Sequence, residues 1–162
     1  MNKKLIISDL SLVLENNKDK SKVLTDVNFD LDESEIGCIL GPSGCGKTSL
    51  LRAIAGFENI NSGSILKDGV CISNSLENTS VQNRKMGMVF QDYALFPNMD
   101  VKTNIAFGLK DATKKEKEDR VNYLLELVSL EQYKDKYPHE LSGGEQQRIA
   151  LIRALAPSPD IL

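Results

Sequence analysis

The apolar positions of residues 5–14 and 23–31 predict two β-strands. The second stretch has a period close to two, with Val27, Phe29 and Leu31 set against polar neighbours, which is typical of a half-buried strand. The polar stretch 15–22 between them predicts a turn. The chain is therefore expected to open with an antiparallel β layer.

The next sixty residues predict short strands around one helix. Residues 35–40 form an apolar run typical of a short buried strand, and residues 48–55 follow a helical pattern. Residues 64–72 contain Asp68-Gly69 between two apolar runs, which predicts a hairpin with a two-residue turn. Residues 86–90 form another short apolar run that ends at Gln91 and predicts a strand.

A helical pattern dominates from residue 100 to residue 136. Val121, Leu124, Leu125 and Val128 fall at i, i+3, i+4 and i+7. The mixed charges of residues 114–120 before them are typical of a solvated helix face. This stretch predicts a helical subdomain inserted into an α/β core.

Composition limits the class of protein without naming a function. The chain has 162 residues, 41% of them hydrophobic and 27% charged, as in a single globular domain. A net charge of −3 disfavours general nucleic-acid binding, and no apolar run reaches the length of a membrane span. Cys38, Cys45 and Cys71 lack C-x-x-C spacing, so we expect reduced thiols, with Cys38 in the core.

Residues 41–48 spell the phosphate-binding pattern G-x-x-x-x-G-K-[ST] between the predicted strand and helix. Glycines allow a tight turn and a close approach to a ligand, and the N–H groups of a helix start attract anions. Lys47 can reach the β- and γ-phosphates, Thr48 can bind Mg²⁺, and Ser49 can donate to a phosphate oxygen. The predicted nucleotide contacts are Gly41, Pro42, Ser43, Gly44, Cys45, Gly46, Lys47, Thr48 and Ser49.

Residues 141–148 contain a second helix start with anion-binding character. Ser142 is a favourable N-cap, and Glu145 three residues later completes a capping box. Gly143 and Gly144 leave the backbone open to a ligand, and a helix is expected from about residue 145 to residue 156. A capping box occurs equally in helices without a ligand, so both interpretations stay open here.

The two helix starts together resemble the ATP-binding cassette (ABC) ATPases. The string Leu-Ser-Gly-Gly-Glu-Gln-Gln-Arg at 141–148 is similar to their signature motif, with Glu145 where Gln is usual. Val-Phe-Gln-Asp at 89–92 resembles their Q-loop, and Arg-Lys-Met-Gly at 84–87 and Tyr-Ala-Leu-Phe-Pro-Asn at 93–98 match importer ATPases. The resemblance is closest to ATPase subunits that import iron(III), sulfate, polyamines or sugars, and the string 41–63 is most similar to the iron(III) branch. It implies an α/β fold with a P-loop NTPase core, an antiparallel β layer and an inserted helical subdomain.

The resemblance also implies residue roles, cofactors and partners. Lys47 and Gln91 would act in ATP hydrolysis, and Thr48 and Gln91 would hold Mg²⁺. Two copies would pair head to tail, each placing its signature residues on the ATP of the other. These signature residues are Leu141, Ser142, Gly143, Gly144 and Glu145. Membrane-embedded permease subunits would hold the ATPase at the cytoplasmic face of the cell membrane, with no role for nucleic acid.

Two departures from the family pattern shape the expectations. Leu14 stands where an aromatic residue usually stacks on adenine. The family's Walker B strand would begin near residue 154, and its Asp, the catalytic Glu and the switch His are not among the 162 residues. We therefore expect a partial nucleotide-binding domain, divided as 1–91, 92–144 and 145–162, with no ATPase activity of its own at family rates. A soluble ABC-type ATPase without a membrane partner, or a non-hydrolysing nucleotide-binding fragment, stays an alternative.

Overall fold

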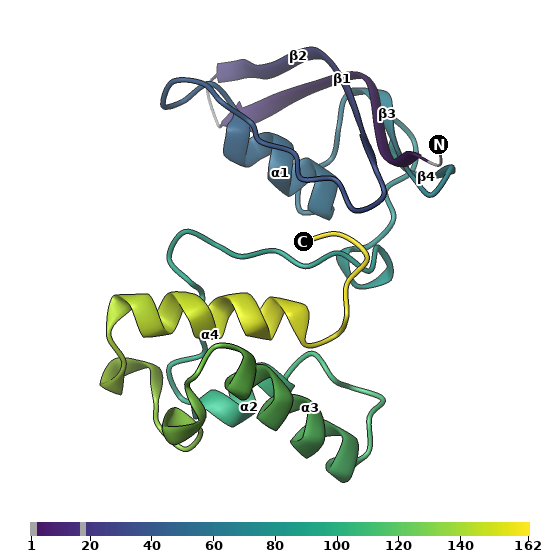
Figure 1. The fold of residues 1–162 in the computed structure, drawn as a ribbon. Coiled ribbons are helices and arrows are strands. Elements are labelled where there is room, and N and C mark those ends of the chain that lie inside the picture. Colours follow the sequence, from purple (N-terminus) through teal and green to yellow (C-terminus); the bar gives the residue numbers. More distant parts are fainter. Residues whose placement is uncertain (1–2, 17–18) are drawn as a thin grey trace. The chain divides into compact units, whose positions relative to one another are not determined.

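The computed structural model describes residues 3–16 and 19–162, and it describes side chains outside residues 14–21. Contacts divide the chain into two compact units, Met1–Arg84 and Lys85–Leu162. In Figure 1 the first unit runs from purple to blue-teal and contains the sheet, and the second runs from teal to yellow and contains most of the helices.

The first unit is built on a four-stranded antiparallel sheet. Its strands are β1 (Lys3–Asn16), β2 (Asp19–Asp32), β3 (Ser62–Lys67) and β4 (Val70–Asn74), in the order β2-β1-β3-β4. The predicted β layer and hairpin are confirmed, with Asp68 and Gly69 both at positive φ in the turn. The stretch 15–22 is mostly strand rather than turn, because β1 and β2 pair up to Asn16 opposite Asp19; residues 17 and 18 lie outside the described residues.

A bulge in β1 sets which side chains enter the core of the first unit. Leu5, Ile7, Leu10 and Leu12 are all buried, so the alternation shifts by one position between Ile7 and Leu10. The pairing of β1 with β2 shifts register at the same place, and Asp9 there has φ of 49°. Opposite the bulge Gly63 has φ of 83°, and a Cβ at this position would collide with the Ser8 and Asp9 carbonyl groups.

One helix, α1 (Lys47–Ala55), lies along the sheet and buries Leu50, Ala53 and Ile54 (Figure 1). It confirms the predicted helix within a residue. A short 3₁₀ helix, η1 (Val81–Asn83), closes the unit.

The buried strand predicted at residues 35–40 is wrong. These residues form no strand, Ile36 and Leu40 are 95% and 86% exposed, and Cys38 is exposed rather than in the core. No strand within the described part of the chain pairs with this run, and an apolar pattern alone cannot supply the hydrogen bonds that a strand requires.

The second unit contains three α-helices and two 3₁₀ helices. They are α2 (Val101–Ala106), α3 (Lys114–Leu127), η2 (Glu131–Tyr133), η3 (Pro138–Glu140) and α4 (Gly143–Leu155). Its core includes Val101, Ile105, Leu124, Ile149 and Ile152, each at most 1% exposed. The predicted helical stretch and the burial of its apolar stripe are confirmed. The last helix begins two residues earlier than predicted, directly after its N-cap Ser142.

The strand predicted at residues 86–90 is reduced to one bridge. Met86 pairs in parallel with Ile161, the Gly87 N–H donates to the Ile161 carbonyl at 2.8 Å, and the Asp160 N–H donates to the Lys85 carbonyl at 2.8 Å. Residues 87–90 continue without strand geometry.

Candidate functional site

The phosphate loop approaches α1 with a backbone that glycines make possible. Gly44 and Gly46 have φ of 81° and 93°, and a Cβ on Gly46 would collide with Leu24 and the Val23 carbonyl of β2. None of the described side chains caps α1, whose N-cap is Gly46. The N–H groups of its first turn are therefore left for an anion.

Lys47 lies across the mouth of this loop. Its Nζ donates to the Gly41 carbonyl at 2.8 Å and to the Pro42 carbonyl at 2.7 Å, and it lies 3.6 Å from Cys45 Sγ. The ammonium group thus sits inside the curve of the loop on two neutral acceptors. A phosphate oxygen would be a stronger, charge-assisted acceptor for the same group.

Arg84, which the sequence analysis named only within the string 84–87, anchors the far end of α1. Its side chain is 1% exposed, and its Nη1 donates to the Ala53 and Ile54 carbonyls at 3.0 and 2.6 Å. Its other nitrogens donate to the Thr79 and Ile72 carbonyls. Burial lowers the pKa of this guanidinium, and a positive charge at a helix C-terminus is favourable. The helix that carries Lys47 is therefore fixed by a buried charge.

Gln91 lies in an exposed turn of the second unit, followed by strained backbone. Tyr93 and Ala94 have φ of 61° and 47°, a region that non-glycine residues seldom adopt. Arg153 of α4 holds both residues: its Nη2 donates to the Tyr93 carbonyl at 2.9 Å and its Nη1 to the Ala94 carbonyl at 2.5 Å. The shape of the turn after Gln91 is thus tied to α4, the helix that begins within the signature string.

The next part of this loop is held by Asn104, a buried side chain of α2. Its Oδ1 accepts from the Phe96 N–H at 2.9 Å, and its Nδ2 donates to the Phe96, Met99 and Asp100 carbonyls at 2.9–3.1 Å. Neither Asn104 nor Arg153 was expected from the sequence. A polar residue on an otherwise apolar helix face was the available signal in each case.

The signature string divides into a buried anchor and an exposed helix start. Leu141 is 6% exposed and belongs to the helical core, whereas Ser142, Gly143 and Gly144 are exposed. The predicted capping box is present: Ser142 Oγ accepts from the Glu145 N–H at 3.4 Å, and Glu145 Oε2 accepts from the Ser142 N–H at 2.7 Å.

Gly143 and Gly144 are not required by packing within the chain. Neither has a positive φ, and a Cβ at either position would meet nothing within 4 Å. No contact among the described residues therefore explains why these two positions are glycine. It leaves the start of α4 open to a group from outside the chain.

Glu145 carries a negative charge beside this helix start. Its pKa is lowered to about 2, first by a hydrogen bond from the Tyr133 hydroxyl and then by those from the Ser142 hydroxyl and N–H. The same contact raises the pKa of Tyr133. The carboxylate therefore stays ionised at all ordinary pH values and holds Ser142 in place.

The predicted site residues fall in both units. The phosphate loop, residues 41–49, lies in the first unit, and Gln91 and the signature residues lie in the second. The side chain of Leu14, the proposed departure at the adenine position, lies outside the residues whose side chains are described. In the part of the chain that the structure describes, no helix is both long and apolar enough to cross a membrane.

A family model described as ABC transporter matches residues 24–162. The chain belongs to the ABC transporter family. The predicted resemblance to the ABC-type ATPases is thereby confirmed.

Curated relatives of the chain carry names for different solutes. It is 49% identical over 89% of its length to "Spermidine/putrescine import ATP-binding protein PotA" of Thermotoga maritima and 45% identical over 88% to "Fe(3+) ions import ATP-binding protein FbpC" of Haemophilus influenzae. It is 48% identical over 87% to "Sulfate/thiosulfate import ATP-binding protein CysA" of Bacillus cereus. The matches cover 39%, 41% and 40% of those proteins, so the chain spans about two fifths of their length.

A solved ABC structure supports the predicted fold class. The dimeric structure of the cassette MJ0796 matches with a TM-score of 0.85 and 28% identity, over 96% of this chain and 70% of that one. The predicted ABC ATPase fold is confirmed. The first unit supplies its antiparallel layer and phosphate loop, and the second supplies helices and the signature string.

Proposed function

We propose that this chain is part of the ATP-binding subunit of an ABC importer and binds ATP with Mg²⁺ at residues 41–49. The observation that carries the proposal is the geometry of the phosphate loop, with an uncapped α1 start and the Lys47 ammonium across its mouth. When ATP binds, the Lys47 ammonium group would exchange its hydrogen bonds to the Gly41 and Pro42 carbonyls for bonds to the β- and γ-phosphates. The N–H groups of the loop and first turn would bind the remaining oxygens.

Mg²⁺ fits the donor chemistry of the two residues proposed for it. Mg²⁺ prefers oxygen ligands and is commonly bound by few protein groups together with phosphate oxygens. Thr48 offers an exposed hydroxyl at the start of α1, and Gln91 offers an exposed amide oxygen. The ion would supply neutralisation of phosphate charge, while Gln91 would also position the attacking water.

The signature residues are proposed to act on a second copy of the chain. The open Gly143 and Gly144 backbone and the exposed Ser142 support binding of a γ-phosphate held by a partner, in a head-to-tail dimer. The capping function of Glu145 would keep Ser142 at the helix start. The MJ0796 cassette is named as dimeric, which supports the same assembly here.

The partners, cargo and location follow from the same proposal. Permease subunits would hold the ATPase at the cytoplasmic face of the membrane and receive the conformational change. The cargo would be a solute such as those in the relatives' names, and iron(III) is the one proposed from the resemblance of residues 41–63. The division into parts 1–91, 92–144 and 145–162 belongs to the same proposal.

Two substitutions test ATP binding and dimer formation separately. Lys47→Ala should weaken ATP binding at least tenfold, since each charge-assisted bond contributes about 1.5–3 kcal/mol. Ser142→Ala should leave ATP binding by the monomer intact and abolish ATP-dependent dimerisation. Sedimentation-velocity ultracentrifugation with Mg²⁺ and ATP measures the dimer.

The matched control is Thr113→Ala, which removes the equivalent capping box of α3. Both cap substitutions should cost about 1 kcal/mol of stability. Equal loss of dimer in the two variants would reduce Ser142 to a helix cap, and unchanged ATP affinity in Lys47→Ala would overturn the nucleotide site.

A further inference from the structure

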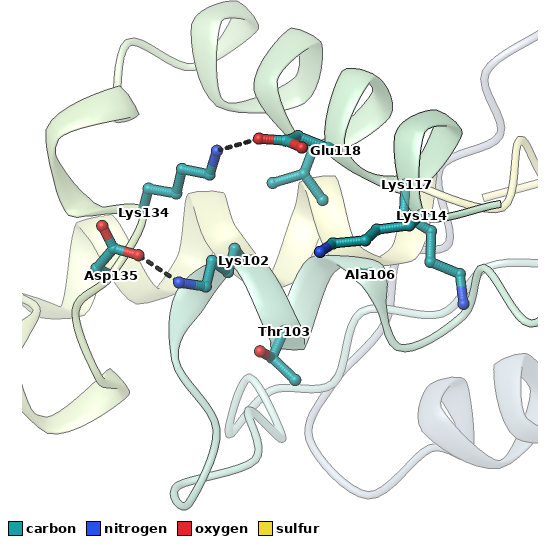
Figure 2. Close-up of a pocket in the computed structure, with 9 residues that line it drawn as sticks. Lys102, Thr103, Ala106, Lys114, Lys117, Glu118, Lys134 and Asp135 are labelled. Carbon is teal, nitrogen blue, oxygen red and sulfur yellow. Dashed lines mark hydrogen bonds and ion pairs between the residues drawn. The ribbon is translucent and has the colours of Figure 1, made fainter. Parts of the chain in front are cut away.

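A pocket of about 420 Å³ lies in the second unit, and none of the predicted nucleotide-binding or signature residues lines it. Figure 2 shows its walls, which come from α2, α3 and the segment after η2. The lining residues are Lys102, Thr103, Ala106, Lys114, Lys117, Glu118, Val121, Lys134 and Asp135. Its size is in the range of sites that hold small organic molecules.

The rim of this pocket carries more positive than negative charge. Four lysines face two acidic residues, which leaves two positive charges uncompensated. Lys102 is paired with Asp135 at 2.5 Å, and Lys134 is bonded to Asn122 at 2.8 Å and lies 3.8 Å from Glu118 (Figure 2). These two lysines are thus accounted for within the unit.

Lys114 and Lys117 supply the excess charge. None of the described residues forms an ion pair or hydrogen bond with either ammonium group, although the Lys117 side chain is half-buried. They lie one turn apart on the same face of α3, where like charges repel. They also lie in its first turn, where positive charge opposes the helix dipole. The chain therefore places two lysines one turn apart on α3 against its own local electrostatics.

The floor of the pocket is apolar. Val121 is 2% exposed, and Ala106 is half-buried beside it. A bound molecule would thus meet two ammonium groups on one side and methyl groups on the other. A phosphomonoester carries close to two negative charges at pH 7, which matches the uncompensated charge of the rim.

We propose that this pocket binds a phosphomonoester that carries a small apolar body. Lys114 and Lys117 pair with the phosphate group, and Ala106 and Val121 contact the body. The site is independent of the phosphate loop, because it contains none of residues 41–49.

Phenyl phosphate is the probe, titrated into the full 162-residue chain and followed by residue-resolved amide NMR. The expected shifts lie at residues 102–106, 114–121 and 134–135, and they saturate together. Lys114→Gln with Lys117→Gln should weaken this binding at least about tenfold, since both charge-assisted bonds are lost. Lys115→Gln, on the same helix but outside the pocket lining, should change it less than twofold.

A second arm separates a soluble ligand from a lipid headgroup. Vesicles of phosphatidylcholine with and without phosphatidic acid present the same phosphomonoester on a membrane surface. Flotation that requires phosphatidic acid and is lost in the double variant assigns the site to the lipid, whereas saturable phenyl phosphate binding alone assigns it to a soluble metabolite.

The proposal is overturned by absence of binding in both arms, by shifts confined to residues 41–49, or by equal losses in Lys115→Gln and the double variant. The last result would indicate unspecific attraction to a basic helix. Unchanged amide positions of the buried core residues Leu124 and Ile149 show that each variant is folded. Shifts confined to residues 41–49 would assign phosphate binding to the phosphate loop instead, and the other outcomes do not bear on ATP binding at Lys47.

Discussion

At the scale of single residues, Glu145 combines a structural and an electrostatic role. It caps α4 through Ser142 and is held by the Tyr133 hydroxyl, which together lower its pKa from 4.5 to about 2. A neutral glutamine can accept the same cap hydrogen bonds without titrating. The charge, rather than the shape, is therefore what distinguishes this chain at the signature position.

Glu145→Gln should remove a pH-dependent part of the stability. Because the folded-state pKa is lowered, the contribution of Glu145 is complete above about pH 4.5 and is lost as the pH falls toward 2. The difference in unfolding free energy between the wild type and Glu145→Gln should shrink across that window in urea titrations. Glu126→Gln, an exposed change in α3 away from both helix starts, is the control for the loss of a surface carboxylate. A constant difference for Glu145→Gln would contradict the role assigned to its charge.

At the scale of elements, α1 is secured from both ends by different means. Its start depends on glycine conformation, and its end depends on the buried Arg84 guanidinium. Removal of the guanidinium takes away the donor to the Ile54 and Thr79 carbonyls in a buried place. Such losses are among the largest that single substitutions cause.

Arg84→Met should therefore destabilise the first unit by about 3 kcal/mol or more. It should also weaken ATP binding, because α1 carries Lys47. Circular dichroism during urea unfolding measures the first effect, and equilibrium ATP titration measures the second. Arg52→Met is the matched control on the same helix, since Arg52 pairs at the surface with Glu58 at 3.0 Å. Comparable effects of the two substitutions would remove the special role of Arg84.

The elements that the sequence predicted well are those specified by neighbours in the chain. The Asp68-Gly69 turn, the Ser142 cap and the apolar stripe of α3 depend on residues within a few positions of each other. The strand prediction at 35–40 was wrong because a strand requires a hydrogen-bonded partner strand, which the local pattern of apolar residues does not reveal. Arg153 was missed for the same reason, since its partners lie 59 and 60 positions away.

At the scale of the whole molecule, the run 35–40 is unusual for a folded protein because it exposes large apolar side chains to solvent. Ile36 and Leu40 are 95% and 86% exposed within six residues of each other, beside the phosphate loop. Clustered apolar surface of this kind favours association with other apolar surfaces. The 162-residue chain should accordingly self-associate as its concentration rises.

Ile36→Ser with Leu40→Ser should reduce that self-association while leaving the first unit folded. Both side chains are exposed, so their replacement removes little packing, whereas it removes the apolar surface that copies of the chain share. Light scattering across a concentration series measures association, and binding of an apolar dye measures the exposed surface. Leu76→Ser is the control, because Leu76 is 93% exposed between polar neighbours. If Leu76→Ser lowers association and dye binding as much as the double variant does, the run at 36–40 is not the surface that draws the copies together.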